Sequence, residues 1–270
     1  MADKTVYFFG VTHAREFSGK VNAMLDRMVK AGKIKRIGIE LMESEIPHFE
    51  RFLPTFVNDQ ERFKKEARER LIQSIEKRGS EAEKFARLNK RYKEQYLDTN
   101  VNALQFFFNV YVACKRHKLD VVPLENRALN QDAISSWLDY LLEIQGIEEA
   151  EHQSKRADFR GDVKSVGKYE NEIKARRKKI KQHVKEFNEK SYARNIAMAE
   201  GAISGRVDAV IVGAGHAPIK RYLRKAGLRV SHVYGRFSGL DLRAQQYFGQ
   251  LRYERAKGIK HAKPRRILSK

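Results

Sequence analysis

Two apolar runs in the chain end in the same four-residue pattern, and this repetition constrains the fold more than any other feature. The run Val6–Phe9 leads into a Gly-x-x-His that ends at His13, and the run Ala209–Val212 leads into a second one that ends at His216. Short apolar runs bounded by glycine are typical of strands buried in a parallel sheet. Because open α/β sheets bind ligands beyond the carboxyl ends of their strands, the two histidines are predicted to face one cleft.

The glycines of these patterns, Gly10, Gly213 and Gly215, can adopt a positive φ and are expected to turn the chain sharply after each strand. A third match ends at His261, in a basic segment with no strand before it, and we interpret it as accidental. The alternative for each of the other two histidines is a packed residue of the core or of a helix start.

The remaining segments complete an α/β pattern. Strands are expected at residues 36–41, 119–124 and 228–234, and helices at 18–31, 101–117, 131–144, 191–203 and 218–226. Pro123 predicts a strand end or an edge strand, since proline cannot donate to a central ladder. The predicted fold class is α/β, with a mainly parallel central sheet and flanking helices.

The chain is expected to hold one α/β domain over residues 1–250. Charged helical insertions are predicted at about 46–98 and 145–190, and Asn100 is expected to cap the helix at 101–117. Residues 251–270 contain 8 basic and 1 acidic side chains. Such a basic tail is compatible with disorder in the free protein.

Charge is distributed unevenly along the chain. Residues 151–270 carry 30 basic and 11 acidic side chains, and account for most of the net charge of +21. A basic half of this kind attracts polyanions, so RNA, DNA or a ribosome is an expected partner through residues 151–270. The alternative is a solvated lysine-rich surface. The residues expected to bind nucleic acid are Lys174, Arg176, Arg177, Lys178, Lys179, Lys181, Arg265 and Arg266.

Composition limits the class of protein. A hydrophobic content of 41% is enough for a packed core and argues against general disorder. The single cysteine, Cys114, excludes an intramolecular disulfide and favours a reducing compartment. The most apolar stretch, residues 103–114, is too short to span a bilayer, and no signal peptide begins the chain. A cytoplasmic protein without a membrane span is therefore expected.

Four predicted strands deliver a titratable residue at their carboxyl ends. These residues are His13, Glu40 with Glu43 nearby, Glu125 and His216. Histidines with carboxylates suit a divalent metal such as Zn, Mn or Co, with His13, Glu40 and His216 as ligands and a water in the open position. Without a metal, a His–Glu pair still serves as a general base on water. The residues alone leave both chemistries open.

Four blocks of the sequence resemble the TraB/PrgY–Tiki family. They are Gly10-Val-Thr-His13, Ile39-Glu40 with Glu43, Arg194-Asn195 within Ser191–Ala199, and Val212-Gly-Ala-Gly-His216. The blocks occur in the family's order and run through most of the predicted α/β core. The wider superfamily includes erythromycin-esterase-like and ChaN-like proteins, and the Tiki branch contains metal-dependent peptidases.

The resemblance implies a metal-dependent hydrolase that acts on a peptide or a small molecule. It implies that the two histidines and a glutamate hold metal or activate water, and that Arg194 and Asn195 stabilise an oxyanion. The membrane-spanning segments of many TraB-like relatives have no counterpart here, and neither the basic insertion nor the basic tail belongs to the shared motifs.

Overall fold

The structure is a computed structural model that describes residues 4–11, 15–54, 59–234 and 257. The chain divides into two compact units. The first unit comprises Met1–Lys64, Val101–Asn130 and Ser191–Lys270, and the second comprises Lys65–Asn100 and Gln131–Lys190. The two segments of the second unit overlap the helical insertions expected at 46–98 and 145–190.

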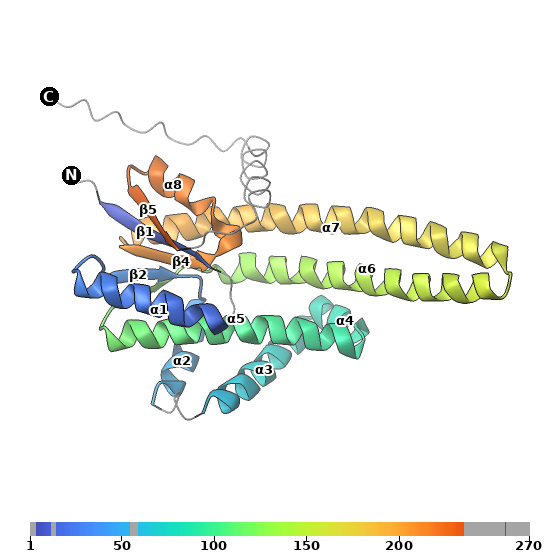
Figure 1. Cartoon of the computed structure of the whole chain (residues 1–270), viewed down its shortest axis with the longest axis horizontal. Coiled ribbons are helices and arrows are strands. Elements are labelled where there is room, and N and C mark those ends of the chain that lie inside the picture. Colours follow the sequence, from blue (N-terminus) through green and yellow to red (C-terminus); the bar gives the residue numbers. More distant parts are fainter. Residues whose placement is uncertain (1–3, 12–14, 55–58, 235–256, 258–270) are drawn as a thin grey trace. The chain divides into compact units, whose positions relative to one another are not determined.

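The first unit is built on a five-stranded parallel sheet in the order β3-β2-β4-β1-β5 (Figure 1). Its strands are β1 (Thr5–Val11), β2 (Arg36–Ile39), β3 (Asp120–Pro123), β4 (Ala209–Gly213) and β5 (Arg229–Tyr234). The α/β class and the parallel sheet are confirmed. Pro123 ends β3, which lies at an edge as predicted. Because all five strands run the same way, their carboxyl ends meet at one edge of the sheet.

Helices follow most of the strands. In this unit they are α1 (Arg15–Lys30), η1 (Glu43–Glu45), α2 (Ile46–Phe52), η2 (Ala214–His216) and α8 (Ile219–Lys225). The helices α3 (Gln60–Glu76), α5 (Lys90–Arg116), α6 (Arg127–Phe159) and α7 (Val163–Ser204) contribute residues to both units, and α4 (Ser80–Arg87) belongs to the second. None of the described helices is long and apolar enough to cross a membrane.

The core of the first unit explains the apolar runs. Every residue of β4 is buried, since β4 lies between β2 and β1 in the sheet. Phe8 and Val210 pack in one cluster with Leu124 and with Met198 of α7. Gly38 of β2 leaves space for this packing, because a Cβ there would lie 2.8 Å from Leu124 Cδ1.

Asp208 joins three segments at the amino ends of the strands. Its Oδ2 accepts hydrogen bonds from the backbone N–H groups of Lys35 (2.9 Å) and Arg36 (3.0 Å), and its Oδ1 lies 3.0 Å from Lys4 Nζ. Burial alone would raise the pKa of Asp208, but these hydrogen bonds and the Lys4 charge hold that pKa below its ordinary value. The carboxylate therefore fixes the start of β2 beside β4.

Three helices are longer than the sequence indicated. Asn100 lies inside α5, where its Nδ2 donates to the Tyr96 carbonyl (2.8 Å), so its prediction as a cap is wrong. Asn89 caps this helix instead, because its Oδ1 accepts from the Tyr92 N–H (3.1 Å). Residues 145–190, predicted as a helical insertion, do not form a separate element: α6 continues to Phe159, and α7 begins at Val163.

Contacts inside the second unit account for the extra length. An apolar cluster contains Leu88, Tyr92, Tyr96, Leu138 and Leu141. Around it, ion pairs join the helices, such as Lys84–Asp139 at 2.8 Å and Arg176–Glu143 at 3.0 Å. Because partner side chains neutralise many of the charges, these polar segments remain helical without a continuous apolar stripe.

Candidate functional site

Two glutamates lie at the carboxyl ends of the parallel strands, and backbone hydrogen bonds fix their positions. Glu40 follows β2 directly, and its N–H donates to the Ile211 carbonyl of β4 (3.0 Å). Glu125 follows β3 by two residues, and its N–H donates to the Leu41 carbonyl (3.2 Å). The ladder thus continues past the ends of the short strands, and it brings together two carboxylates that are 85 residues apart.

Arg194 of α7 bridges these two carboxylates. Its Nε donates to Glu125 Oε1 (3.1 Å) and its Nη2 to Glu40 Oε1 (3.1 Å), with a further bond from Nη2 to Glu125 Oε2. Burial alone would lower the pKa of Arg194, but the charges of Glu125 and Glu40 raise it above its usual value. The guanidinium is therefore a permanent cation between two anions.

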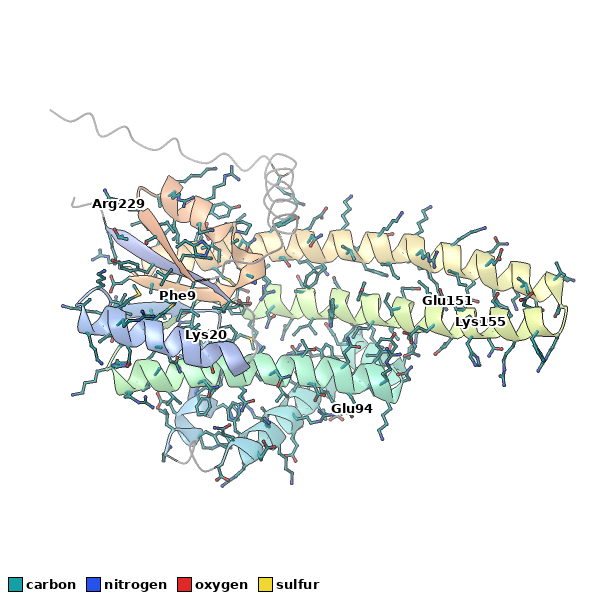
Figure 2. All side chains as sticks on the ribbon, in the orientation of Figure 1. Phe9, Lys20, Glu94, Glu151, Lys155 and Arg229 are labelled. Atoms are coloured by element: carbon teal, nitrogen blue, oxygen red, sulfur yellow. The ribbon has the colours of Figure 1, made fainter. Side chains whose placement is uncertain are left out.

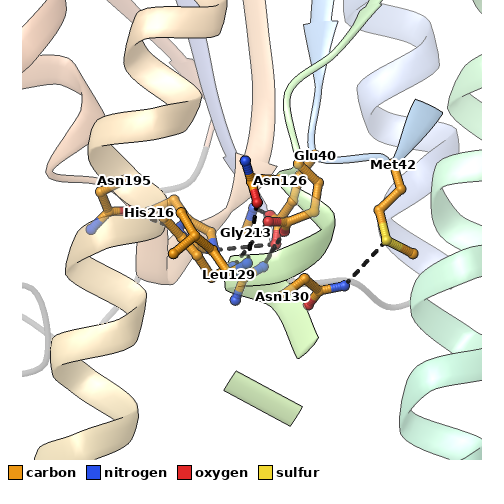
Figure 3. A network of polar contacts seen from close by, with 10 residues as sticks. Glu40, Met42, Asn126, Leu129, Asn130, Asn195, Gly213 and His216 are labelled. Carbon is orange, nitrogen blue, oxygen red and sulfur yellow. Dashed lines mark hydrogen bonds and ion pairs between the residues drawn. The ribbon is translucent and has the colours of Figure 1, made fainter. Parts of the chain in front are cut away.

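His216 joins the same network from the turn after β4. Its Nδ1 lies 2.6 Å from Asn195 Oδ1, and its Nε2 lies 3.1 Å from Glu40 Oε1 (Figure 3). Asn195 is only 1% exposed, and it comes from the helix that also carries Arg194. Because both ring nitrogens face oxygen atoms, a protonated ring donates to both of them, and a neutral ring donates through one nitrogen.

Glu40 is the centre of this arrangement. Its Oε2 accepts a hydrogen bond from the Gly213 N–H at 2.5 Å, while Oε1 faces both Arg194 and His216. The side chains of Glu40 and Arg194 are 9% and 11% exposed, so the charges are largely withdrawn from water. Charges in such surroundings are tolerated when they are paired and hydrogen-bonded, as they are here.

Two contacts beside the network were missed from the sequence. Asn126 follows Glu125 and caps α6 by accepting a hydrogen bond at its Oδ1 from the Leu129 N–H (3.2 Å). Asn130 Nδ2 lies 3.7 Å from Met42 Sδ (Figure 3). The signal for the cap was present, because asparagine three residues before a helical backbone N–H is a common start of a helix.

The structure brings together most of the predicted site residues. Five of them share the network: Glu40, Glu125, Arg194, Asn195 and His216. Glu43 is exposed at the start of η1 and makes none of the contacts described above. His13 lies outside the described residues. The last described residue of β1, Val11, pairs with Gly213 of β4, which donates to Glu40.

The glycines of the motifs do not adopt the positive φ that glycine permits. Gly213 has a φ of −55°, and none of Gly10, Gly213 and Gly215 is among the described glycines with a positive φ. Both strands simply continue further than predicted, since Gly10 pairs with Val212 and Val11 pairs with Gly213. Small size is what Gly10 contributes, because a Cβ there would lie 3.1 Å from the Phe8 ring.

Two of the donors at this edge are close enough together to share a divalent metal. Glu40 Oε1 and His216 Nε2 are 3.1 Å apart, which suits two ligands that each lie about 2.1 Å from one ion. Arg194 shares the same oxygen and opposes a second cation there. Among the described residues no group of three or more His, Cys, Asp or Glu is arranged to hold a metal. Two of the three predicted ligands thus converge, and the third, His13, is outside the described residues.

The residues predicted to bind nucleic acid fall into three sets. Arg176, Arg177 and Lys179 form ion pairs with glutamates of the second unit. Lys174, Lys178 and Lys181 are exposed on α7. Arg265 and Arg266 lie outside the residues that the structure describes.

No family model matches the chain, and neither a curated protein nor a solved structure matches it.

Proposed function

We propose that the chain is a hydrolase whose reacting site is the network at the carboxyl edge of the sheet. The observation that supports this most is the convergence of Glu40, Glu125, Arg194, Asn195 and His216 in one largely buried cluster. These side chains come from four separate parts of the chain. Open parallel sheets place their ligands at this edge, and the motif resemblance to the TraB/PrgY–Tiki family favours the same residues.

The energetic cost of the cluster supports a functional role. A buried ion pair contributes little net stability compared with apolar residues of the same volume, because desolvation offsets the attraction. The first unit already has an apolar core that includes Leu124 and Met198 beside this region. A charged cluster is therefore not needed to hold the sheet together, whereas hydrolysis needs groups that move a proton.

In the proposed reaction, His216 and Glu40 form the pair that handles the proton. One member accepts a proton from the attacking water and later returns it to the leaving group. Asn195 holds the imidazole through Nδ1, and Arg194 fixes Glu40 relative to Glu125, so we assign positioning roles to both. Their expected part in stabilising an oxyanion stays a prediction that follows from the resemblance.

The alternative chemistry uses a divalent metal at the same pair of donors, where the Arg194 contact to Glu40 Oε1 opposes a second cation. Glu40 Oε1 and His216 Nε2 would hold it, with His13 as the ligand that the sequence predicts. A Zn, Mn or Co ion bound there would lower the pKa of the attacking water and polarise the scissile carbonyl. In that case Arg194 would still bind Glu125 through Nε and keep that carboxylate beside the site.

The proposed substrates are peptides or small molecules with an amide or ester bond, and the proposed location is the cytoplasm. The single cysteine accords with a reducing compartment. Burial raises the pKa of the Cys114 thiol to about 12, so this group stays protonated and takes no part in the proposed reaction.

The test combines metal content with hydrolysis of a peptide and ester panel. The wild-type protein, His216→Ala, Glu40→Gln and the exposed control Glu43→Gln are purified at high salt, analysed for Zn, Mn and Co, and assayed with each metal and with none. Hydrolysis by the wild type and by Glu43→Gln, with loss of about 100-fold or more in the other two variants, supports the proposal. Equal turnover by His216→Ala and the wild type would refute it.

A further inference from the structure

Opposite charges are segregated between two segments of the second unit. Residues 131–159 of α6 carry seven acidic and two Lys or Arg side chains, whereas residues 163–190 of α7 carry four acidic and ten basic ones. Cross-helix ion pairs follow from this, namely Arg177–Glu151 at 3.5 Å, Arg176–Glu143 at 3.0 Å and Lys179–Glu143 at 3.5 Å. Part of the positive charge of α7 is thus neutralised by α6.

The guanidinium of Arg176 packs against Gly146 of α6. A Cβ at Gly146 would lie 2.2 Å from Arg176 Nη1, so glycine at this position leaves the room that the guanidinium occupies. The same side chain also donates to Glu172 through Nε (3.0 Å). Arg176 therefore holds the two helices together and is not available as a surface cation.

Four lysines of α7 have a different environment. Lys174, Lys178, Lys181 and Lys185 are all exposed, and none has an acidic partner among the described residues. Their spacing of four, three and four residues places them on one face of the helix, along about 16 Å of its length. We call these four residues the lysine stripe. Some of the side chains along α7 extend outward, away from α6 (Figure 2).

The connection between the two helices exposes two large apolar side chains. Phe159, the last residue of α6, is 94% exposed, and Val163, the first residue of α7, is 82% exposed. Val163 precedes Lys174 by eleven residues, which is three helical turns, so it lies on the same face as the lysine stripe. Single exposed apolar side chains are common on protein surfaces, so these two residues support a binding site only together with the lysine stripe.

We propose that this face binds single-stranded nucleic acid, with phosphates along the lysine stripe and an unpaired base on Phe159. Proteins follow a sugar-phosphate backbone with a row of cations and stack bases on aromatic side chains. Phe159 lies at the connection before Val163, which is about 16 Å along α7 from Lys174, so one strand of several nucleotides could contact both. An anionic bilayer is the less suitable partner. A helix that lies in a membrane interface buries a continuous apolar face, whereas this face is apolar only at Val163 and carries lysines further along α7. The surface includes none of the residues of the hydrolytic network.

The test is a binding titration of the full chain with fluorescent single-stranded RNA and DNA of mixed sequence, over a series of salt concentrations. In one variant the stripe lysines become Gln, at positions 174, 178, 181 and 185. In the control variant four exposed lysines elsewhere, Lys30, Lys33, Lys77 and Lys90, become Gln, so that net charge falls equally. Circular dichroism and thermal unfolding verify that both variants fold.

The stripe variant is expected to lose at least tenfold in affinity at low salt, while the control loses about threefold or less. Each phosphate contact on a single strand contributes about 0.7 to the slope of log affinity against log salt, so the slope should fall by about 2.8 in the stripe variant alone. Phe159→Ala should weaken binding to single strands about tenfold and leave binding to a duplex unchanged. A loss on RNA alone would identify RNA as the preferred strand, whereas parallel losses on RNA and DNA would mean that the face binds both.

Three results would overturn the proposal. The first is a stripe variant that binds like the control variant. The second is a Phe159→Ala variant that binds single strands like the wild type. The third is tight binding to vesicles with anionic headgroups that is lost in the stripe variant while oligonucleotides bind only weakly, which would assign the face to a membrane surface.

Discussion

Arg194 and His216 share one oxygen atom: Arg194 Nη2 and His216 Nε2 each lie 3.1 Å from Glu40 Oε1. A carboxylate with two such neighbours is the point at which the network is most sensitive to substitution. Its second oxygen is occupied as well, by the Gly213 N–H.

Glu40→Gln should therefore destabilise the protein and abolish hydrolysis together. Loss of the negative charge leaves Arg194 with one anion, and removal of one partner from a buried ion pair costs about 3 kcal/mol. Urea unfolding of the variant measures this cost. Glu43→Gln serves as the control, because its side chain is exposed and should change the free energy of unfolding by less than about 0.5 kcal/mol. Equal stability of the two variants would contradict a paired Glu40.

Asn195→Ala should leave the fold intact and reduce turnover. The imidazole of His216 loses the oxygen that faces Nδ1 at 2.6 Å, so its orientation toward Glu40 is no longer fixed. We expect turnover to fall by about 10- to 100-fold, the size of effect seen when a group that orients an active-site histidine is removed. The pH profile of hydrolysis should shift in this variant, whereas a residue with only a packing role would leave the profile unchanged.

Asp208→Asn should remove a stabilisation that depends on pH. The folded pKa of Asp208 is lowered, so the carboxylate stabilises the protein above its unfolded pKa of about 3.8, and this contribution is lost as the pH falls through the folded value. The wild type should therefore be more stable than the variant at pH 7, with the difference narrowing below about pH 4. Denaturant midpoints between pH 7 and pH 3 provide the measurement. A difference that grows on acidification would reverse the assigned sign.

Gly38→Ala should destabilise the first unit, while Gly19→Ala should not. A Cβ at Gly38 would lie 2.8 Å from Leu124 Cδ1 in a packed core, and overpacking of this kind costs about 1–3 kcal/mol. Gly19 lies in α1 with nothing within 4 Å of an added Cβ, so alanine should stabilise the helix by about 0.5–1 kcal/mol. Thermal unfolding of the two variants should give shifts of opposite sign.

Gln105→Leu should stabilise the protein. Gln105 of α5 is 1% exposed, and neither its Oε1 nor its Nε2 has a hydrogen-bond partner among the described residues. A buried amide without partners costs about 1–3 kcal/mol, and leucine of similar size avoids that cost. A rise in the denaturant midpoint is expected. If stability falls instead, the amide makes contacts in solution that the described residues do not supply.

The sequence allowed the strands and the principal side chains of the network to be predicted, because each depends on local pattern. The buried run before Gly213 is a strand, and the titratable residues after β2, β3 and β4 follow from the parallel order. The contacts between these side chains could not be predicted from local sequence patterns. Glu40 and Arg194 are 154 residues apart, and only the folded sheet shows that Arg194 binds two carboxylates.

The predicted helix boundaries were wrong because they depend on tertiary packing. Both Asn89 and Asn100 are acceptable caps, and the choice between them depends on the packing around Tyr92 and Tyr96, which is tertiary. The sequence shows how many charges α6 and α7 carry but not which of them are paired. Ion pairs such as Arg176–Glu143 join positions 33 residues apart, so they appear only in the folded structure.

The strand order has a consequence for how the protein is made. The central strand, β4, lies at residues 209–213, and both β1 and β2 pair with it rather than with each other. During synthesis, β1 and β2 must therefore wait until residues 209–213 have been translated before they gain their common partner. Pairings between such distant segments form slowly and leave strand edges exposed in the meantime. His216 follows this late strand by only three residues, so a nascent chain would gain its central strand and its proposed reacting pair almost together, with only β5 still to be added.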